Sequence, residues 1–490
     1  MTDRMTVLAA DIGGSSLKAA LISRAGAVVA QAALPSPPPD AGGMIAPAGW
    51  WTAFRDAAAT LKGEDASAFA AVAAIAVTGV TRTPVVLDDD ANPLIGAMPA
   101  RDARASAIAA RDAIDPQDCA EAAHYDAFHP AARLKWISAA WPDVVRKAAA
   151  VVDPKDFIAA RLTGRIASDA IASARLAAAA DAARGRSLLS RLGLPDRLVP
   201  DRLAPGSIIA PVRGGLDAPF GELAGRPVVM ASHDTWCGVV GLGALVPGRA
   251  YNISGTTETF GVLSRAPAKA EGLIDLQWGD DVHQLGGPGQ NGADVVTWLG
   301  ELFGTDASAE LARALAQPRD AAPLIFLPYL SGERVPFWDA DLRGAFLGLS
   351  RQHGRSDLVR AVLEGIAFLN ATVLSRAEAA TGITVEEVRF GGGGTRIAEW
   401  AQIKSDILGR AVVTVAVEEP GVLGAALAAF VALGTHDTLA RAQQLMVRVA
   451  QRFEPRAAQR DFYRALGRLF GAAHDALRPI SHALSKISTA

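Results

Sequence analysis

Two short segments place glycine and hydroxyl side chains directly after an apolar run: Asp11-Ile-Gly-Gly-Ser-Ser and Ser254-Gly-Thr-Thr. Glycine tolerates positive φ and lets phosphate oxygens approach backbone N–H groups, while serine and threonine add hydroxyl donors. A pair of such turns can hold a polyphosphate from two sides. The residues that we expect to contact it are Gly13, Gly14, Ser15, Ser16 and Lys18 in the first turn and Gly255, Thr256 and Thr257 in the second.

A carboxylate, Asp11, closes the first apolar run. Mg²⁺ prefers oxygen ligands and keeps much of its hydration shell, so a carboxylate at a strand end suits this ion through water. An ordinary hairpin turn with a surface aspartate accounts for the same residues equally well. Two other phosphate sites are disfavoured, because the sequence has no GxxxxGK[ST] motif and its glycine run at 391–394 lacks GxGxxG spacing.

A second carboxylate, Asp234, lies between the apolar run at 226–231 and an expected helix. An aspartate at this place is commonly a helix N-cap. A carboxylate held rigidly there can also accept the proton of a hydroxyl group, and the two roles are compatible.

The elements that position these residues follow a repeated pattern. Short apolar runs predict strands at 6–10, 17–22, 27–30 and 71–77, with a helix at 50–61 and another at 238–245. After the break Val246-Pro-Gly, the order strand, small polar turn, strand returns at 250–254 and 259–263, about 240 residues later. We therefore expect two similar α/β lobes, comprising residues 1–246 and 247–490, and a final helix at 457–477 followed by a loose end.

Composition narrows the class of protein. The 490 residues are 50% hydrophobic and 20% charged, with a net charge of −3, so neither nucleic acid nor an anionic membrane is expected as a partner. Two cysteines, Cys119 and Cys237, match no metal-ligand spacing and favour a reducing compartment. No signal peptide or transmembrane helix is expected, and the interpretation is a cytoplasmic protein.

The segment Leu327-Pro-Tyr-Leu-Ser-Gly-Glu-Arg-Val-Pro-Phe-Trp-Asp, followed by Leu342-Arg-Gly-Ala-Phe-Leu-Gly-Leu, resembles the C-terminal signature of the FGGY carbohydrate kinases. Asp11-Ile-Gly-Gly-Ser, Trp50-Trp51, Lys155-Asp-Phe-Ile and Leu423-Gly-Ala-Ala resemble further blocks of the family, in order along the chain. The resemblance implies two actin-like (ribonuclease H-like) lobes, each a mixed five-stranded sheet flanked by helices, with the substrates meeting in an interlobe cleft.

The resemblance also implies roles for individual residues. Asp234 matches the family's catalytic base, which makes the neighbouring His233 a weak candidate for that role. Glu333 and Arg334 lie inside the signature, where we favour a structural role. The residues that match the family's adenosine-binding block are Gly392, Gly393, Gly394 and Thr395.

The expected sugar-binding residues depart from the family pattern. Thr81, Arg82 and Thr83 stand where xylulokinase-like members have Met-His-Gly, and Ala100 replaces a tryptophan while Asp102 remains. Arg82 offers several fixed donors to hydroxyl or carboxylate oxygens. Trp236 is a candidate stacking surface for the sugar, and a buried structural tryptophan is an equal alternative.

The expected activity is transfer of the γ-phosphoryl group of ATP, with Mg²⁺, to a hydroxyl group of a sugar. A ketopentose such as xylulose or ribulose is the first candidate acceptor, and a polyol, a deoxyketose or a sugar acid is the alternative. Two other classes remain open: a sugar-sensing protein with weak catalysis, and an actin-like ATPase without a sugar substrate. A homodimer is compatible with the resemblance, because similar enzymes are often dimers.

Overall fold

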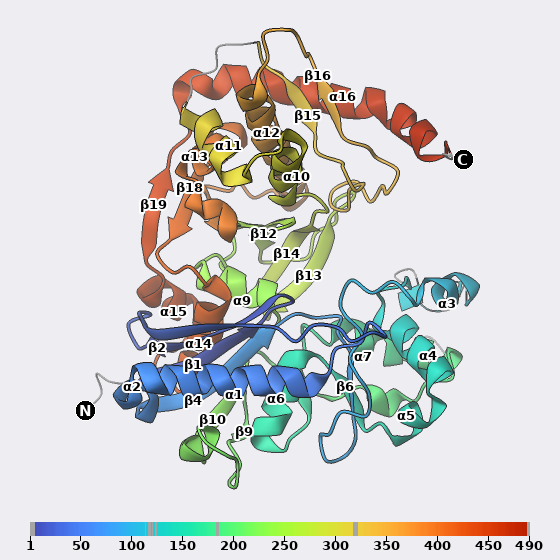
Figure 1. The fold of residues 1–490 in the computed structure, drawn as a ribbon, viewed down its shortest axis with the longest axis vertical. Coiled ribbons are helices and arrows are strands. Elements are labelled where there is room, and N and C mark those ends of the chain that lie inside the picture. Colours follow the sequence, from blue (N-terminus) through green and yellow to red (C-terminus); the bar gives the residue numbers. More distant parts are fainter. Residues whose placement is uncertain are drawn as a thin grey trace. The chain divides into compact units, whose positions relative to one another are not determined.

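The structure is a computed structural model that describes residues 5–112, 114–115, 119, 121–122, 125–182, 186–316 and 322–487. The chain divides into two compact units (Figure 1). The first unit comprises Met1–Gly241 and Glu419–Met446, and the second comprises Leu242–Glu418 and Val447–Ala490. The final helix runs to Ser485 instead of ending at 477, so most of the segment that we expected to be loose is helical. Residues 488–490 lie outside the described part.

The first unit is built on a six-stranded sheet in the order β3-β2-β1-β4-β10-β9. Strands β1, β4 and β10 are parallel, whereas β2 and β3 form antiparallel hairpins and β9 pairs antiparallel with β10. The strands are β1 (Thr6–Ile12), β2 (Ser16–Ser23), β3 (Val28–Pro35), β4 (Val72–Gly79), β9 (Ile208–Pro211) and β10 (Pro227–Met230).

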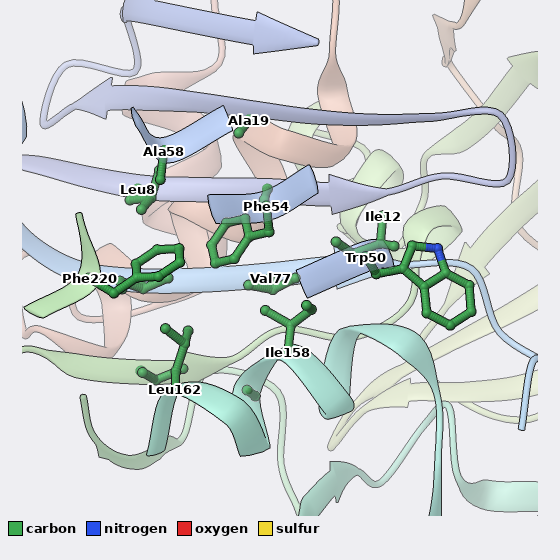
Figure 2. Packing of buried hydrophobic residues seen from close by; sticks show 14 of the residues in the cluster. Leu8, Ile12, Ala19, Trp50, Phe54, Ala58, Val77, Ile158, Leu162 and Phe220 are labelled. Atoms are coloured by element: carbon green, nitrogen blue, oxygen red, sulfur yellow. The ribbon is translucent and has the colours of Figure 1, made fainter. Parts of the chain in front are cut away.

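Helices cover both faces of this sheet. Leu8 and Ile12 of β1 pack against Trp50 and Phe54 of α1 (Pro47–Glu64), with Ile158 of α6 (Pro154–Thr163) in the same core cluster (Figure 2). The alternate residues of β1 are also buried, and α14 (Pro420–Ala432) packs against both β1 and β4. Because β1 is buried on both faces, it reads as a nearly continuous apolar run that breaks only at Asp11.

A second layer of short elements is inserted between β4 and β9. Its helices pack into their own apolar cluster around Leu134, Ile137 and Leu189. The elements are β5 (Val85–Leu87), α3 (Ser106–Arg111), α4 (Pro130–Ala140), α5 (Pro142–Lys147), β6 (Ala150–Val152), β7 (Ala167–Asp169), α7 (Ala174–Ala180), α8 (Leu188–Arg191) and β8 (Asp201–Leu203). Helix α2 (Ala66–Ala70) precedes β4.

The second unit has a seven-stranded sheet in the order β13-β14-β12-β11-β17-β18-β19. Its strands are β11 (Ala250–Ser254), β12 (Glu258–Ser264), β13 (Ile274–Gly279), β14 (Val282–Pro288), β17 (Glu387–Gly391), β18 (Ala411–Val415) and β19 (Val449–Phe453). The remaining elements are α10 (Asp294–Phe303), α11 (Ala307–Ala316), β15 (Ile325–Leu327), β16 (Ala345–Leu347), α12 (Arg355–Thr381), α13 (Ala398–Leu408) and α16 (Arg460–Ser485).

The two sheets share one topology. In the first unit β1 pairs antiparallel with β2 and parallel with β4, and in the second β11 pairs antiparallel with β12 and parallel with β17. The expected fold class and the repeat are thus confirmed, but the expectation of five strands is wrong for both sheets. Six strands follow the common order, because β9 and β19 each pair antiparallel with the last parallel strand of their sheet, at β10 and at β18. Strand β13 extends the second sheet by one more strand at its other edge.

The structure divides the chain differently from the expected boundary at 246/247. The first unit's leading segment ends at Gly241, where α9 (Asp234–Gly241) also ends, four residues before the expected helix end. Moreover, α14 and α15 (Leu439–Met446) belong to the first unit. Helices α9 and α14 approach so closely that a Cβ on Gly424 would lie 1.8 Å from the Cys237 carbonyl oxygen, which only glycine allows.

Helix α12 is the one described helix that is long and apolar enough to cross a membrane by length and composition. In the structure 72% of its apolar window is buried. It packs against β12, β15 and α13 as the central helix of the second unit.

Candidate active site

The turn between β1 and β2 is tight and its shape requires glycine. Gly13 donates its N–H to the Ser16 carbonyl oxygen at 3.0 Å, and a Cβ on Gly13 would lie 2.6 Å from that oxygen. Ser36 holds the turn from outside, since its hydroxyl donates to the Gly13 carbonyl oxygen at 2.6 Å. Gly14 and Ser15 are exposed, and a Cβ on Gly14 would meet nothing within 4 Å. The turn therefore offers an open backbone edge at its tip.

Asp11 lies just inside this turn in an unusual environment. Its Oδ1 is buried and has no hydrogen-bond partner in the described part of the chain, while its Oδ2 would lie 2.8 Å from a Cβ placed on Gly421, the second residue of α14. Burial raises the pKa of Asp11 from 3.8 to about 7, and the carboxylates of Asp234 and Glu419 act in the same direction against Lys18. A cation bound here would stabilise the ionised carboxylate and so lower the pKa of Asp11.

Lys18 faces Asp11 across the hairpin, because these two residues are register partners. Its ammonium group pairs with Glu419 at 2.6 Å, and both side chains are about one-third exposed. A phosphate group would therefore compete with an existing ion pair for Lys18. Sequence reasoning missed this partner, because Glu419 lies 401 residues further along the chain and belongs to the first unit together with α14.

Asp234 is the first residue of α9, directly after the β10 strand and its polar extension. Its side chain is 42% exposed, and its Oδ1 accepts hydrogen bonds from the Thr235 N–H at 2.6 Å and the Thr235 hydroxyl at 3.1 Å. The cap position belongs to His233 instead, because the Trp236 N–H donates to His233 Nδ1 at 3.2 Å. The N-cap alternative for Asp234 is thus wrong, and the carboxylate faces solvent from a rigid helix start.

A buried polar network stands directly behind this helix start. The Ser232 hydroxyl donates to Asp169 Oδ1 at 2.8 Å, and the Lys155 ammonium lies 2.7 Å from Asp169 Oδ2 and 2.5 Å from Asp156 Oδ1. Burial acts to raise the pKa of Asp169, but the attraction of Lys155 holds that pKa below its usual range. The network fixes the backbone from which His233 and Asp234 extend. Lys155 and Asp156 stand in a segment that resembles a family block, but no local pattern indicated that they converge with Asp169 and Ser232.

The expected sugar-binding segment follows β4. Arg82 is exposed and adopts φ of 58°, while Thr81 is half-buried and Thr83 is buried. A fully buried guanidinium, that of Arg133 on α4, donates to four backbone carbonyl oxygens in this region. The acceptors are those of Arg82, Pro99, Ala100 and Asp102, at 2.5 to 2.9 Å. Arg133 therefore ties the segment after β4 to the segment at 99–102, a role that sequence reasoning missed.

Asp102 and Trp236, the other two residues considered for the sugar, lie in different environments. Asp102 pairs with Arg104 at 2.6 Å and lies in the segment that Arg133 holds. Burial acts to raise the pKa of Asp102, but hydrogen bonds from Arg104 hold it below its usual value, so the group stays ionised. Trp236 is only 3% exposed, which favours its structural alternative over a stacking surface.

The predicted nucleotide residues of the second unit lie against one another. The Gly255 N–H donates to the Thr257 carbonyl oxygen at 3.1 Å and closes the turn after β11. Gly392 follows β17 with φ of 85°, and a Cβ there would lie 2.3 Å from the Ser254 carbonyl oxygen. A Cβ on Gly394 would lie 2.9 Å from the Ser254 hydroxyl, which is buried without a hydrogen-bond partner among the described residues.

Glu333 is held by hydrogen bonds from within the second unit, and the structural role of Glu333 and Arg334 stays a prediction. Glu333 is buried and accepts hydrogen bonds from the Asn291 amide at 2.9 Å and the Arg334 N–H at 3.0 Å. Burial raises the pKa of Glu333 to about 7, against these hydrogen bonds. All of these partners belong to the second unit.

The residues present fit ATP and Mg²⁺. The buried unpaired oxygen atoms, Asp11 Oδ1 in the first unit and the Ser254 hydroxyl in the second, are acceptor and donor groups that lack a partner among the described residues. No group of three or more metal-binding side chains occurs in the described part of the chain. A Mg²⁺ ion held by Asp11 would therefore take its other ligands from water and phosphate, as this ion commonly does.

Comparison with known proteins covers both units. Residues 6–241 match the N-terminal domain of the FGGY family of carbohydrate kinases, and residues 250–433 match its C-terminal domain. The xylulose kinase of Escherichia coli is 29% identical over 57% of this chain and 59% of its own length. A glycerol kinase of Geobacter is 35% identical over 47% of each chain, so the matches span about half the length of these relatives.

A solved structure extends the likeness to the whole chain. The kinase from Brucella ovis described as a xyloylose kinase has a TM-score of 0.86 and 25% identity, and it covers 97% of this chain and 100% of its own. The fold of this chain is thus similar to that structure along nearly its whole length. Together with the match of both domains, it follows that this chain belongs to the FGGY family of carbohydrate kinases.

Proposed function

We propose that this protein is an ATP-dependent carbohydrate kinase that transfers the γ-phosphoryl group of ATP to a hydroxyl group of a sugar. The observation that carries the proposal is the pair of carboxylates in the first unit. Asp11 has a buried Oδ1 that lacks a hydrogen-bond partner among the described residues, whereas the Asp234 side chain is 42% exposed at the start of α9. Asp234 is also among the causes of the raised pKa of Asp11. Two neighbouring acids in such different environments suit two different tasks.

Asp234 would act as the catalytic base. The sugar oxygen forms a bond to the γ-phosphorus, the bond from that phosphorus to the β–γ bridging oxygen breaks, and the hydroxyl proton passes to the Asp234 carboxylate. A loose transition state needs little basicity, so position matters more than a raised pKa. The Thr235 N–H and hydroxyl orient the carboxylate, and the network of Ser232, Asp169 and Lys155 supports the backbone before it.

Asp11 would hold Mg²⁺ through water, and the ion supplies neutralisation of phosphate charge when it is bound. The β1–β2 turn would present backbone N–H groups and the hydroxyls of Ser15 and Ser16 to phosphate oxygens. In the second unit the expected nucleotide contacts are the turn Gly255 to Thr257 and the segment Gly392 to Thr395. The proximity of Ser254 to both Gly392 and Gly394 supports a common task for these two segments.

A ketopentose such as xylulose or ribulose is the acceptor that we propose, because relatives named as xylulose kinases match the chain. Arg82, Thr81 and Asp102 would bind its hydroxyl groups. The exposed guanidinium of Arg82 is the feature that favours the alternative acceptor, a sugar acid, because arginine binds carboxylates with two parallel hydrogen bonds. Polyols and deoxyketoses of similar size remain in the same test. The place of action that we propose is the cytoplasm, where ATP and Mg²⁺ are available.

The test is an ADP-release assay over pentuloses, hexuloses, aldonates and polyols, with and without Mg²⁺. We expect Mg²⁺-dependent ADP formation with one acceptor class, and formation of the sugar phosphate detected by mass spectrometry. Calorimetric sugar binding without ADP release across the panel would favour a sugar-sensing protein. ATP hydrolysis at the same rate with every sugar and with none would instead indicate an ATPase, and either result would overturn the proposal.

A further inference from the structure

A lysine and a glutamate form an ion pair inside the second unit. Lys404 lies on α13 and Glu258 is the first residue of β12, two elements of that unit that are labelled in Figure 1. The Lys404 Nζ atom lies 3.3 Å from Glu258 Oε2, and the two residues are 0% and 5% exposed. Burial lowers the pKa of Lys404, although Glu258 acts in the opposite direction. Because two charges are costly to remove from water, this pair needs an explanation beyond packing.

The Glu258 end of the pair supports the turn at 255–257, which it follows directly in the chain. Besides the Lys404 ammonium, the side-chain amides of Asn252 and Asn370 donate hydrogen bonds to Glu258 Oε2, the second of them at 3.3 Å. The other oxygen, Oε1, is buried and has no hydrogen-bond partner among the described residues. All the hydrogen bonds that the described residues give to this carboxylate therefore converge on one oxygen, which fixes the residue that ends the turn.

The Lys404 end of the pair supports the segment at 392–395. The ammonium nitrogen lies 4.7 Å from the centre of the Trp400 ring and 5.1 Å from that of the Phe390 ring. Cation–π attraction holds a cation to aromatic rings at about 6 Å or less. Gly394 rests against the same two rings, since a Cβ placed there would lie 2.9 Å from Trp400 Cζ3 and 3.0 Å from Phe390 Cζ. Lys404 therefore holds the two rings on which the backbone of this segment lies.

We propose that the ion pair of Lys404 and Glu258 positions the turn at 255–257 and the segment at 392–395 for the nucleotide, so that ATP affinity depends on two groups that ATP does not touch. This inference rests on the proposed function, because it takes these two segments as the nucleotide site. The pair joins the residue that ends the first segment to the rings that carry the second. A shift of either segment would stretch the contact between the two charges.

Direct binding of the nucleotide by the pair does not fit its surroundings. The Lys404 ammonium is fully buried among two rings and a carboxylate, so it offers no donor to a phosphate group. The buried Oε1 of Glu258 is likewise closed to solvent. Both are thus positioning residues, which act through the backbone segments that they hold.

A purely structural role also accounts less well for the pair. Uncharged residues of similar volume in place of a buried ion pair often leave stability unchanged or increase it, so stability alone does not require the charges. Ion pairs and hydrogen bonds differ from apolar contacts in depending on direction as well as distance. A directional link between two segments is what a site with a close backbone needs.

The first experiment separates stability from nucleotide affinity. Lys404→Met and Glu258→Gln each leave one buried charge without its partner, so each should lower the midpoint of chemical denaturation. The variant with both changes should return to the wild-type midpoint. Its calorimetric dissociation constant for ATP should nevertheless rise about tenfold, the equivalent of about one lost hydrogen bond, because the two segments are no longer linked. A double variant that regains both the stability and the ATP affinity of the wild type would overturn the proposal.

Steady-state kinetics locate the effect within the reaction. In the double variant the KM for ATP should rise about tenfold, while kcat and the KM for the sugar stay unchanged. The matched control is Arg410→Met, which breaks an ion pair with Glu378 at 3.0 Å in the same unit. The control should lose stability and keep the wild-type KM for ATP. An equal rise of the ATP KM in the control, or of the sugar KM in the double variant, would show a general loss of structure and contradict positioning.

Amide hydrogen exchange tests the two segments without any ligand. The Gly255 and Thr395 amides each donate a 3.1 Å hydrogen bond within their own segment. Both should exchange faster in the double variant than in the wild type, and at the wild-type rate in Arg410→Met. Unchanged exchange of both amides in the double variant would overturn the inference.

The combined results separate this inference from the proposed function. A wild type that binds ATP but releases no ADP with any sugar, together with weak ATP binding by the double variant, would refute the kinase and keep the positioning role. A wild type that phosphorylates a sugar, together with a double variant that binds ATP normally, would refute the positioning role and keep the kinase.

Discussion

The two turns that follow β1 and β11 occupy the same place in sheets of the same order, yet they carry different chemistry. In each, a glycine N–H closes the turn, at Gly13 and at Gly255. Two residues before that glycine the first unit has Asp11, whereas the second has Ile253. Lys18 stands opposite Asp11, whereas Thr259 stands opposite Ile253. Both turns are therefore closed by a glycine N–H, although the hydrogen bond spans three residues in the first turn and two in the second. At this strand position a carboxylate occurs only in the first unit.

The surroundings of the turns differ in the same sense. Asp11 is beside the start of α14 and close to Asp234, so the first turn belongs to a charged site. The second turn packs on Gly392 and Gly394, where a side chain would collide with Ser254. A site that handles a metal ion and a proton needs carboxylates, whereas a segment that lies against a nucleotide needs a close backbone. The first turn therefore suits metal and proton chemistry, and the second suits close contact with a nucleotide.

The largest effect should come from Asp234→Asn. Removal of a positioned base typically costs about 10²–10⁴-fold in rate. We expect a loss of this size in the rate of sugar-dependent ADP release, with nucleotide binding retained in calorimetry. Asp217→Asn, on the same unit, serves as the control with unchanged rate. If the Asp234→Asn variant keeps most of its activity, Asp234 is not the catalytic base.

Asp11→Asn should both impair Mg²⁺ use and change the pH dependence of stability. The folded protein favours protonated Asp11, so the stability that this group contributes is fully present below pH 3.8 and is lost as the pH rises towards about 7. The asparagine variant lacks that loss. In the unliganded protein, the unfolding temperature of the wild type should therefore fall relative to that of the variant as the pH rises between these two values. Parallel curves would contradict the raised pKa.

Gly392→Ala tests the close backbone of the second turn. With φ of 85° and the Ser254 carbonyl oxygen 2.3 Å from the new Cβ, we expect a loss of about 1–3 kcal/mol in stability, because the backbone must shift. Gly393→Ala is a matched control, since its Cβ would meet nothing within 4 Å. Chemical denaturation measures both. Equal stability of the two variants would show that the segment is less constrained than the geometry indicates.

Ser254→Ala should have the smallest effect, and together with Ser36→Ala it tests whether a hydroxyl group stabilises each turn. Its hydroxyl has no hydrogen-bond partner among the described residues, so its removal should leave folding stability unchanged. Ser36→Ala, by contrast, removes the 2.6 Å hydrogen bond to the first turn and should cost about 1 kcal/mol. The ATP KM of Ser254→Ala should rise a few-fold. An unchanged KM would mean that the buried hydroxyl faces no nucleotide.

Sequence reasoning succeeds where the signal is local. The apolar runs around β1, β2, β4 and β11 and the glycine turns after them are fixed by neighbouring residues, so the fold class and its repeat could be predicted. The edge strands β9, β13 and β19 could not, because strand pairing between distant segments leaves little trace in either segment. The bounds of α9 were predicted four residues too late, at 238–245, because nothing local shows that Gly241 lies at a close crossing with α14.

In the candidate site too, residues with a local sequence signal could be predicted and residues defined by distant contacts could not. Asp11 and Asp234 each follow an apolar run, and this made them visible as candidates. Arg133, Lys155 and Glu419 were not visible in these roles, because a buried charge is defined by partners far away in the sequence. Trp236 shows the opposite error, since an aromatic residue beside a candidate base looks functional until its burial is known.

The crossing of α9 and α14 has a consequence for how the protein is made. During translation, residues up to Gly241 leave the ribosome long before Pro420–Ala432 exist, so one face of the first sheet lacks its covering helix for most of synthesis. Domains generally fold as units once their segments are available. The unit that begins first is therefore completed only near the end of synthesis, and a chain truncated before α14 would expose β1 and β4 to aggregation.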